Sequence, residues 1–106
     1  MFARKVSIRL KSDAAGPFIQ KMENEIIPLL RKQNGFLDEV TLISQGGKEI
    51  YAYSFWENSE DAEQYDRTTF KEVTHLLTGL IEGSVRIRTY MVANSTFHKI
   101  ASAVAS

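Results

Sequence analysis

Three side chains in the middle of the sequence could do chemistry: Trp56, Tyr65 and His75. His75 carries the one imidazole in the body of the domain, and imidazole is the side chain whose ordinary pKa lies nearest neutrality. Tyr65 joins an apolar ring to one hydroxyl, which needs a partner when it is buried. Trp56 can equally be a packing residue between a strand and a helix, and His75 a residue at the edge of the core. These residue types suit proton transfer and the binding of an aromatic molecule.

Most established catalytic motifs are absent from the sequence. It contains no Gly-x-Ser-x-Gly turn, no glycine-rich phosphate loop and no dinucleotide-binding fingerprint. It has no cysteine, which excludes disulfides, thiolate metal sites and a cysteine nucleophile. Its two histidines are far apart, so we expect no metal site. Thirteen basic residues balance thirteen acidic ones, which argues against nucleic acid or a membrane surface as a partner.

The elements that must position these side chains follow from the periodicity of the apolar residues. A period of two indicates half-buried strands, and a period near 3.6 indicates amphipathic helices. Strands are predicted around residues 6–10 and over 36–43, 49–56 and 85–92. Helices are predicted over 17–35, with a bend at Pro28, and from 58 or 59 to 83, with a bend near 68–69.

The element order β-α-β-β-α-β predicts an α+β, ferredoxin-like fold, in which two helices cover one face of a four-stranded antiparallel sheet. We expect one domain over residues 1–106, with its core at about 3–92 and a C-terminal tail at 93–106. No run of about eighteen apolar residues occurs, and the N-terminus lacks the apolar stretch of a signal peptide. The sequence therefore predicts a cytoplasmic protein with no membrane partner.

Alternation along each strand assigns side chains to the two faces of the sheet. The helix-facing set is predicted to be Val6, Ile8, Leu10, Val40, Leu42, Ala52, Ser54, Trp56, Val85, Ile87, Thr89 and Met91. The opposite face is predicted to carry Lys5, Ser7, Arg9, Glu39, Thr41, Ile43, Tyr51, Tyr53, Phe55, Arg86, Arg88, Tyr90 and Val92.

This opposite face is unusually rich in aromatic and arginine side chains, the types enriched at the centres of interfaces. A homodimer contact is predicted there, centred on Tyr51, Tyr53 and Phe55. The alternative is an ordinary solvated sheet face with amphipathic side chains lying flat on it. Two arginines in an interface need a counter-charge, for which we predict Glu39 of the same or the partner chain.

A local pattern spans the second and third predicted strands and the helix that follows them. It consists of Gly35-Phe36 opening one strand, Phe55-Trp56 ending the next, Ser59 in the polar turn, and Tyr65 nine residues after the tryptophan. With this pattern and the element order, residues 3 to 92 resemble the antibiotic biosynthesis monooxygenase-like superfamily. That resemblance implies a dimeric α+β barrel.

The resemblance also implies three functions to be weighed. The first is a cofactor-independent monooxygenase acting on a small apolar or aromatic molecule, with Tyr65 or His75 assisting proton removal and with no cofactor expected. The others are a non-catalytic small-molecule-binding barrel and a haem-degrading monooxygenase. Under the first function the expected catalytic residues are His75, Tyr65 and Trp56, and the expected substrate-binding residues are Ser54, Phe70 and Met91.

Some positions depart from the patterns of the superfamily. The cofactor-free oxygenases carry an asparagine four residues before the tryptophan, where this sequence has Ala52. The haem-degrading members carry an asparagine and a tryptophan at positions that resemble Val6 and Tyr65, and a histidine close to His75. These departures favour the binding function over both kinds of oxygenase.

Overall fold

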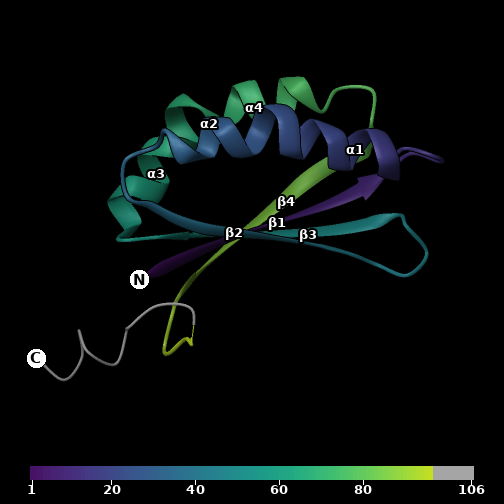
Figure 1. Cartoon of the computed structure of the whole chain (residues 1–106). Coiled ribbons are helices and arrows are strands. Elements are labelled where there is room, and N and C mark those ends of the chain that lie inside the picture. The colour runs from purple at the N-terminus through teal and green to yellow at the C-terminus, as the bar shows by residue number, and fades with distance from the viewer. Residues whose placement is uncertain (97–106) are drawn as a thin grey trace, which may run out of the picture.

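Strands and helices alternate as β-α-β-β-α-β in the computed structural model, which describes residues 1–96 (Figure 1). The elements are β1 (Phe2–Leu10), α1 (Ala15–Lys21), η1 (Met22–Ile26), α2 (Ile27–Arg31), β2 (Phe36–Ile43), β3 (Glu49–Trp56), α3 (Ser59–Thr68), α4 (Phe70–Leu76) and β4 (Ile81–Met91). The predicted element order is confirmed. Most of the predicted C-terminal tail, residues 97–106, lies outside the described residues.

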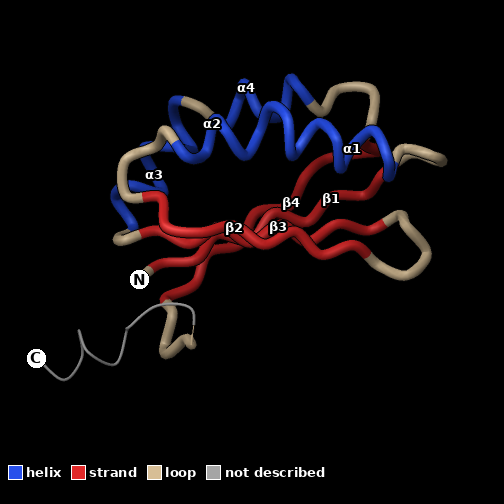
Figure 2. The backbone as a smooth tube through the Cα atoms, in the orientation of Figure 1, coloured by secondary structure: helices blue, strands red, loops and turns tan. Residues whose placement is uncertain are grey.

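The four strands form one sheet in the order β2-β3-β1-β4, and every neighbouring pair is antiparallel. All of the helices lie on one side of this sheet (Figure 2). The ferredoxin-like fold expected from the sequence is therefore confirmed. Among residues 1–96, no helix is both long enough and apolar enough to cross a membrane.

The first helical stretch is continuous but widens into a π-helical turn, η1, immediately before Pro28. The amide of Ile27 bonds to the carbonyl of Met22, five residues back. Proline has no N–H and its ring crowds the carbonyl four residues earlier, so a wider turn relieves the contact that a regular α-helix would force. The predicted bend at Pro28 is thus a π turn at Met22–Ile26, and the helix ends at Arg31 rather than at Gly35.

The second helical stretch starts where the sequence predicted but ends earlier. The Asn58 side chain accepts a hydrogen bond from the Asp61 amide (2.9 Å), and the helix breaks at Thr69 into α3 and α4. It was expected to continue to residue 83, and this is wrong, because α4 ends at Leu76 and Gly79, with φ of +91°, turns the chain. Strand β4 consequently begins at Ile81 instead of residue 85.

The face assignment is correct for β1, β3 and β4 and wrong for β2. Glu39 lies opposite Ser54, and Thr41 opposite Ala52, which places both on the helix-facing side. An irregularity in pairing between Phe36 and Asp38 shifts the alternation of this strand by one residue. Val40 and Leu42 therefore lie on the opposite face, and Ile43 on the helix-facing one.

The same correction removes Glu39 as a counter-charge for Arg86 and Arg88 within one chain. Its side chain lies on the other side of the sheet, and β2 and β4 form opposite edges. The core between sheet and helices is centred on fully buried side chains: Trp56, Phe18, Leu10, Ile26 and Ile50.

Candidate functional site

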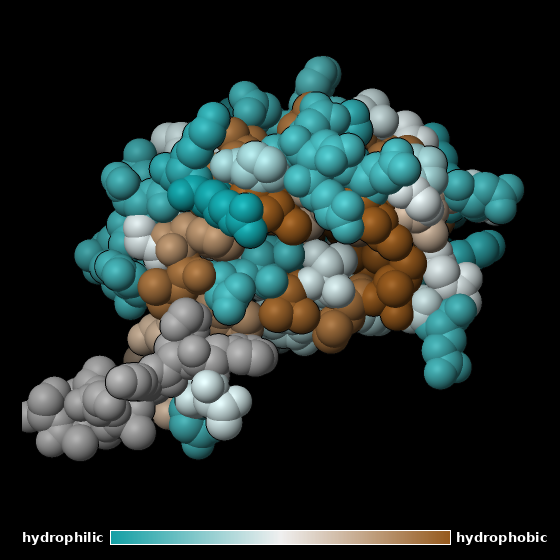
Figure 3. All heavy atoms as spheres, viewed as in Figure 1, coloured by the Kyte–Doolittle hydropathy of each residue, from teal (hydrophilic) through white to brown (hydrophobic). Residues whose placement is uncertain are grey.

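A cavity of about 40 Å³ lies between the helices and the helix-facing side of the sheet. Its apolar lining comprises Val6, Ile8, Phe18, Met22, Ile26, Leu30, Ala52, Phe70, Val73, Leu77 and Val85. Its polar lining comprises Glu39, Ser54, Tyr65 and Thr74. A few polar groups in an apolar cavity are typical of sites that orient a small molecule. Figure 3 shows apolar side chains exposed along the junction between the helices and the sheet.

Tyr65 is the polar side chain most deeply placed at this cavity. It projects from α3, is 3% exposed, and packs its ring against Trp56 (5.1 Å between centroids) and Phe70 (6.0 Å). Burial raises the pKa of Tyr65 to about 12, and the nearby Arg4 opposes part of that rise. The phenol therefore stays protonated at neutral pH. Within residues 1–96 its hydroxyl makes no hydrogen bond, which leaves a buried donor available to a ligand.

Glu39 brings a carboxylate to the same cavity from the edge strand β2. One of its oxygens accepts a hydrogen bond from the Thr41 hydroxyl (2.6 Å). Burial raises the pKa of the Glu39 carboxyl, the Thr41 hydrogen bond works in the opposite direction, and the neighbouring Asp38 adds to the rise. A half-buried carboxylate of raised pKa is a better proton acceptor than an exposed one.

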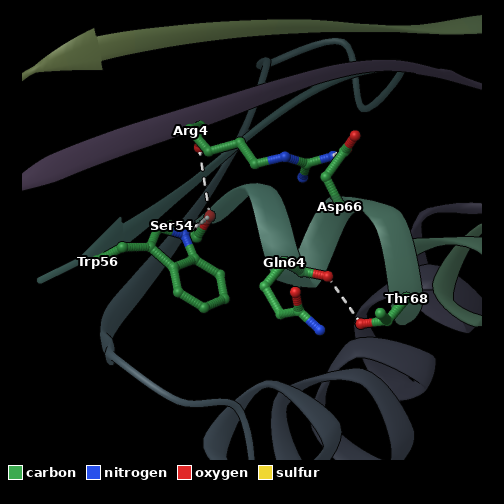
Figure 4. Close-up of polar contacts among 6 residues, drawn as sticks. All are labelled: Arg4, Ser54, Trp56, Gln64, Asp66 and Thr68. Atoms are coloured by element: carbon green, nitrogen blue, oxygen red, sulfur yellow. Dashed lines mark hydrogen bonds and ion pairs between the residues drawn. The ribbon is translucent and has the colours of Figure 1, made fainter. Parts of the chain in front are cut away.

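Ser54 is held by structural hydrogen bonds. Its Oγ accepts a bond from Nε1 of Trp56 (2.9 Å) and donates to the main-chain carbonyl of Arg4 (3.4 Å), as Figure 4 shows. Trp56 is 0% exposed, so its indole N–H depends on this acceptor, the one it has among residues 1–96. Both hydrogen-bonding directions of the serine are thus taken up inside the protein.

Arg4 is a buried cation on the helix-facing side of β1, where it is 2% exposed. Its guanidinium forms an ion pair with Asp66 of α3 (2.6 Å) and lies over the ring of Phe70, 4.0 Å from its centroid. The same guanidinium is 5.3 Å from the centroid of Tyr65. Arg4 therefore ties β1 to α3 and α4 and supports two of the aromatic walls of the cavity.

The cavity is adjacent to a wider hollow at the β2 edge, with a volume of about 330 Å³. The two spaces share three lining residues: Phe18, Met22 and Glu39. Met22 opens the π turn, and π turns inside helices are frequent at functional sites. Its unbranched, flexible side chain can move more readily than a β-branched one.

The expected site residues divide into two groups. Ser54, Tyr65 and Phe70 line the cavity. Trp56 lies behind Tyr65 and does not line it. His75 is exposed, because α4 turns Val73 and Leu77 toward the sheet and the histidine away from it. Met91 is 86% exposed at the end of β4.

The placement of His75 also bears on haem degradation. That function was expected to use a histidine at this position, and the side chain points away from the cavity. Among residues 1–96 no group of three or more histidine, aspartate or glutamate side chains could hold a metal ion.

The sequence analysis missed two of the polar residues described above. Arg4 continues the alternation of Val6, Ile8 and Leu10, so the pattern could have placed it on the helix-facing side. Glu39 was hidden by the irregularity at the start of β2, which no single-sequence pattern reveals.

No protein-family model matches the chain, and no curated protein matches its sequence. A protein of unknown function from Nitrosomonas europaea superimposes with a TM-score of 0.74 at 9% identity, covering 90% of this chain and 91% of that one. A monooxygenase from Streptomyces coelicolor, solved in complex with nanaomycin D, gives 0.73 at 14% identity over 89% of this chain and 88% of that one. SnoaB, a cofactor-independent oxygenase from Streptomyces nogalater, gives 0.72 at 10% identity over 90% and 95%. At these identities the likeness shows the fold alone.

Proposed function

We propose that this chain, which shares its fold with antibiotic biosynthesis monooxygenase structures, is a cofactor-independent monooxygenase for a small aromatic molecule. One observation carries the proposal: the buried hydroxyl of Tyr65 has no partner within residues 1–96 and borders an apolar cavity that also contains the Glu39 carboxylate. A hydrogen-bond donor and a proton acceptor at one mostly apolar cavity are what proton abstraction next to a carbonyl needs.

The substrate class follows from these two groups. It is an aromatic ketone or phenol with an acidified C–H, which Glu39 deprotonates while Tyr65 donates a hydrogen bond to the oxygen where negative charge develops. The carbanion reduces O₂ and forms a carbon-bound peroxide. Loss of a second proton with cleavage of the O–O bond then converts the CH₂ group and O₂ into a carbonyl and one molecule of water. The substrate supplies all the electrons, so no cofactor takes part in this sequence.

Tyr65 is better suited to donate a hydrogen bond than to remove a proton, because burial raises its pKa to about 12. The sequence suggested Tyr65 or His75 for proton removal, and the geometry favours Glu39 for that step. Trp56 supports the Tyr65 ring from behind, and Phe70 forms an apolar wall.

Substrate entry requires the site to widen. The cavity of about 40 Å³ holds little more than one water molecule, whereas small-molecule pockets have volumes of about 300–1,000 Å³. We infer that movement of the Met22 side chain joins the cavity to the hollow of about 330 Å³ at the β2 edge. The joined space reaches the lower end of that range.

Anthrone is a suitable probe, because its oxidation to anthraquinone is the reaction described above. We expect O₂ uptake to match anthraquinone formation one to one. Glu39→Gln should lower kcat/KM by about 10²–10⁴-fold, and Tyr65→Phe by about 10²–10³-fold. Glu72→Gln, an exposed glutamate on α4, is the matched control and should keep full activity. Equal turnover by the Glu39→Gln variant and the parent would refute the proposal.

A non-catalytic binding protein is the second candidate, favoured by Ala52 in the cavity wall, where the resembling oxygenases have an asparagine. Calorimetric titration with anthraquinone separates the two. Binding that Tyr65→Phe weakens, without O₂ uptake in the presence of anthrone, would establish binding alone.

We also propose a homodimer through the sheet face that carries Tyr51, Tyr53 and Phe55. These three rings are only half-buried in one chain, and Leu42 beside them is 50% exposed. An apolar surface of this kind on one face of a sheet is typical of an interface.

A further inference from the structure

Arg4 and Asp66 form an ion pair beside the Tyr65 ring, and the two charges differ in their exposure to water. The guanidinium comes from β1 and the carboxylate from α3, and Figure 4 shows them pointing toward each other. The Arg4 side chain is 3% exposed, whereas the Asp66 side chain is 48% exposed. Water screens an exposed charge much more than a buried one. The positive charge of the pair therefore acts on the protein interior more strongly than the negative charge does.

The Arg4 guanidinium is held in a fixed place by its contacts. It donates a hydrogen bond to Oδ1 of Asp66 (2.6 Å), and it lies 4.0 Å from the centroid of the Phe70 ring and 5.3 Å from that of Tyr65. Stacking on aromatic rings suits the planar guanidinium and fixes its orientation. Within residues 1–96 it makes no hydrogen bond to the Tyr65 hydroxyl, and it does not line the cavity. Arg4 can therefore influence a ligand in the cavity only through Tyr65.

Three charged groups, from β1, α3 and β2, act on the hydroxyl of Tyr65. Burial is the main cause of its raised pKa of about 12; Arg4 lowers this pKa, whereas Asp66 and Glu39 raise it by smaller amounts. The effect of Arg4 exceeds that of Asp66, as their different exposure requires. A phenol with a lower pKa is a stronger hydrogen-bond donor to an oxygen on which negative charge develops. The ion pair as a whole therefore makes Tyr65 a stronger donor than burial alone would leave it.

We propose that Arg4 is a positioning residue that acts through Tyr65: its buried charge strengthens the hydrogen bond that Tyr65 donates to a ligand oxygen, and Asp66 limits this effect. The role of this contact in oxidation rests on the proposed function, but the effect of Arg4 on Tyr65 does not. The arrangement favours ligands whose oxygen carries or acquires negative charge, namely phenolates and enolates. A neutral alcohol or ether oxygen gains much less from a nearby cation.

Two variants distinguish this electrostatic effect from a purely structural one. Asp66→Asn removes the negative charge, and its amide oxygen can still accept the hydrogen bond from Arg4. The double variant Arg4→Met/Asp66→Asn removes both charges and leaves no buried charge without a partner. A structural role predicts that both variants disturb Tyr65 in the same way. The electrostatic role predicts that they shift its acidity in opposite directions.

Nuclear magnetic resonance of protein labelled with ¹³Cζ-tyrosine measures the acidity without a ligand, and Tyr65→Phe assigns the signal. We expect the pKa of Tyr65 to fall below that of the parent in Asp66→Asn and to rise above it in the double variant. Glu60→Gln, at an exposed carboxylate in the first turn of α3, is the control and should leave the pKa unchanged. Circular dichroism establishes that each protein is folded over the pH range used.

An unchanged or higher pKa of Tyr65 in the folded Asp66→Asn variant would overturn the proposal. This single variant decides the sign even if the double variant does not fold. Because the titration needs no ligand and no turnover, its result is independent of whether anthrone is oxidised. Failure of the enzymatic proposal is therefore detected separately.

Infrared spectroscopy of bound ¹³C-carbonyl anthraquinone tests the second half of the proposal, the effect on a ligand oxygen. A stronger hydrogen bond polarises the carbonyl and lowers its stretching frequency. We expect a lower frequency in Asp66→Asn than in the parent, and in the double variant a higher one, closer to that in Tyr65→Phe. The reverse order, or a frequency that stays constant while the pKa of Tyr65 moves, would show that the charge of Arg4 does not reach the ligand.

Discussion

The hydrogen bond between Trp56 and Ser54 is the buried polar contact whose removal should be felt most clearly. Ser54→Ala deletes the only acceptor within residues 1–96 for the indole N–H of Trp56, a side chain that is 0% exposed. An orphaned buried donor costs about 1–3 kcal/mol, whereas the 3.4 Å bond from Ser54 to the Arg4 carbonyl is long and contributes little. We therefore expect Ser54→Ala to lower the free energy of unfolding by about 1–3 kcal/mol.

A double-mutant cycle isolates this contact from the loss of packing. Trp56→Phe removes the donor and some ring volume, and it leaves Ser54 bonded to Arg4. In the phenylalanine background there is no donor to orphan, so Ser54→Ala should cost markedly less. The expected coupling free energy is about 1–2 kcal/mol, within the range for residues in direct contact.

Urea denaturation followed by far-ultraviolet circular dichroism is the appropriate assay, because Trp56 is the only tryptophan and its fluorescence disappears with the substitution. Each midpoint and slope is fitted by linear extrapolation, and the slope should stay constant across the four proteins. Ser12→Ala, at an exposed serine, is the control and should change stability by less than about 0.5 kcal/mol. Equal costs of Ser54→Ala in the two backgrounds would show that this hydrogen bond does not stabilise the fold.

Two further predictions follow from residues at the cavity. Met22 is 7% exposed, so Met22→Ala should lower the free energy of unfolding, measured by urea denaturation, by about 2–5 kcal/mol. The same substitution should tighten anthraquinone binding, because it opens the cavity toward the hollow at the β2 edge. Weaker binding by a folded variant would contradict the entry route. Burial raises the pKa of Glu39 in the folded state above its ordinary 4.5. The folded protein therefore binds more protons than the unfolded chain, and it loses stability as the pH rises from 4.5 through the folded-state pKa. The stability of the Glu39→Gln variant should therefore increase relative to the parent across this pH window and stay constantly higher above it. If the difference in unfolding free energy between the two proteins did not change from acid to neutral pH, the raised pKa of Glu39 would be contradicted.

The order of elements was predictable because each one carries a strong local signal. Asn58 caps a helix through its own side chain, and alternation along β1 and β3 follows directly from burial on one face. Boundaries were less predictable where two signals compete. Leu80 and Ile81 continue a helical spacing, yet Gly79 turns the chain and Ile81 pairs with Leu10. A strand pairing between residues far apart in the sequence overrides the helical spacing of the apolar residues, and the neighbouring sequence does not indicate it.

The candidate site was predictable only in its aromatic part. Tyr65 and Phe70 occupy the inner side of α3 and α4, as their spacing suggests. His75 was predicted as a site residue because the ordinary pKa of imidazole lies near neutrality. The type of a side chain does not determine which side of a helix it occupies. Glu39 depended on the phase of β2, and a one-residue irregularity reverses every side chain that follows it.

The hydrogen bonds at the cavity distinguish polar groups that are bonded within the protein from polar groups that could bond to a ligand. Thr74 donates to the carbonyl of Lys71 (2.9 Å), and Ser54 is bonded to Trp56 and Arg4, so the fold itself uses both hydroxyls. Glu39 has one oxygen engaged by Thr41, and the Tyr65 hydroxyl has no partner within residues 1–96. Leaving a buried hydroxyl unpaired costs stability, and native proteins rarely retain such a group without a use. A ligand oxygen that accepts from Tyr65 would remove that cost, so the fold is expected to be more stable with a phenolic or carbonyl ligand bound than without one.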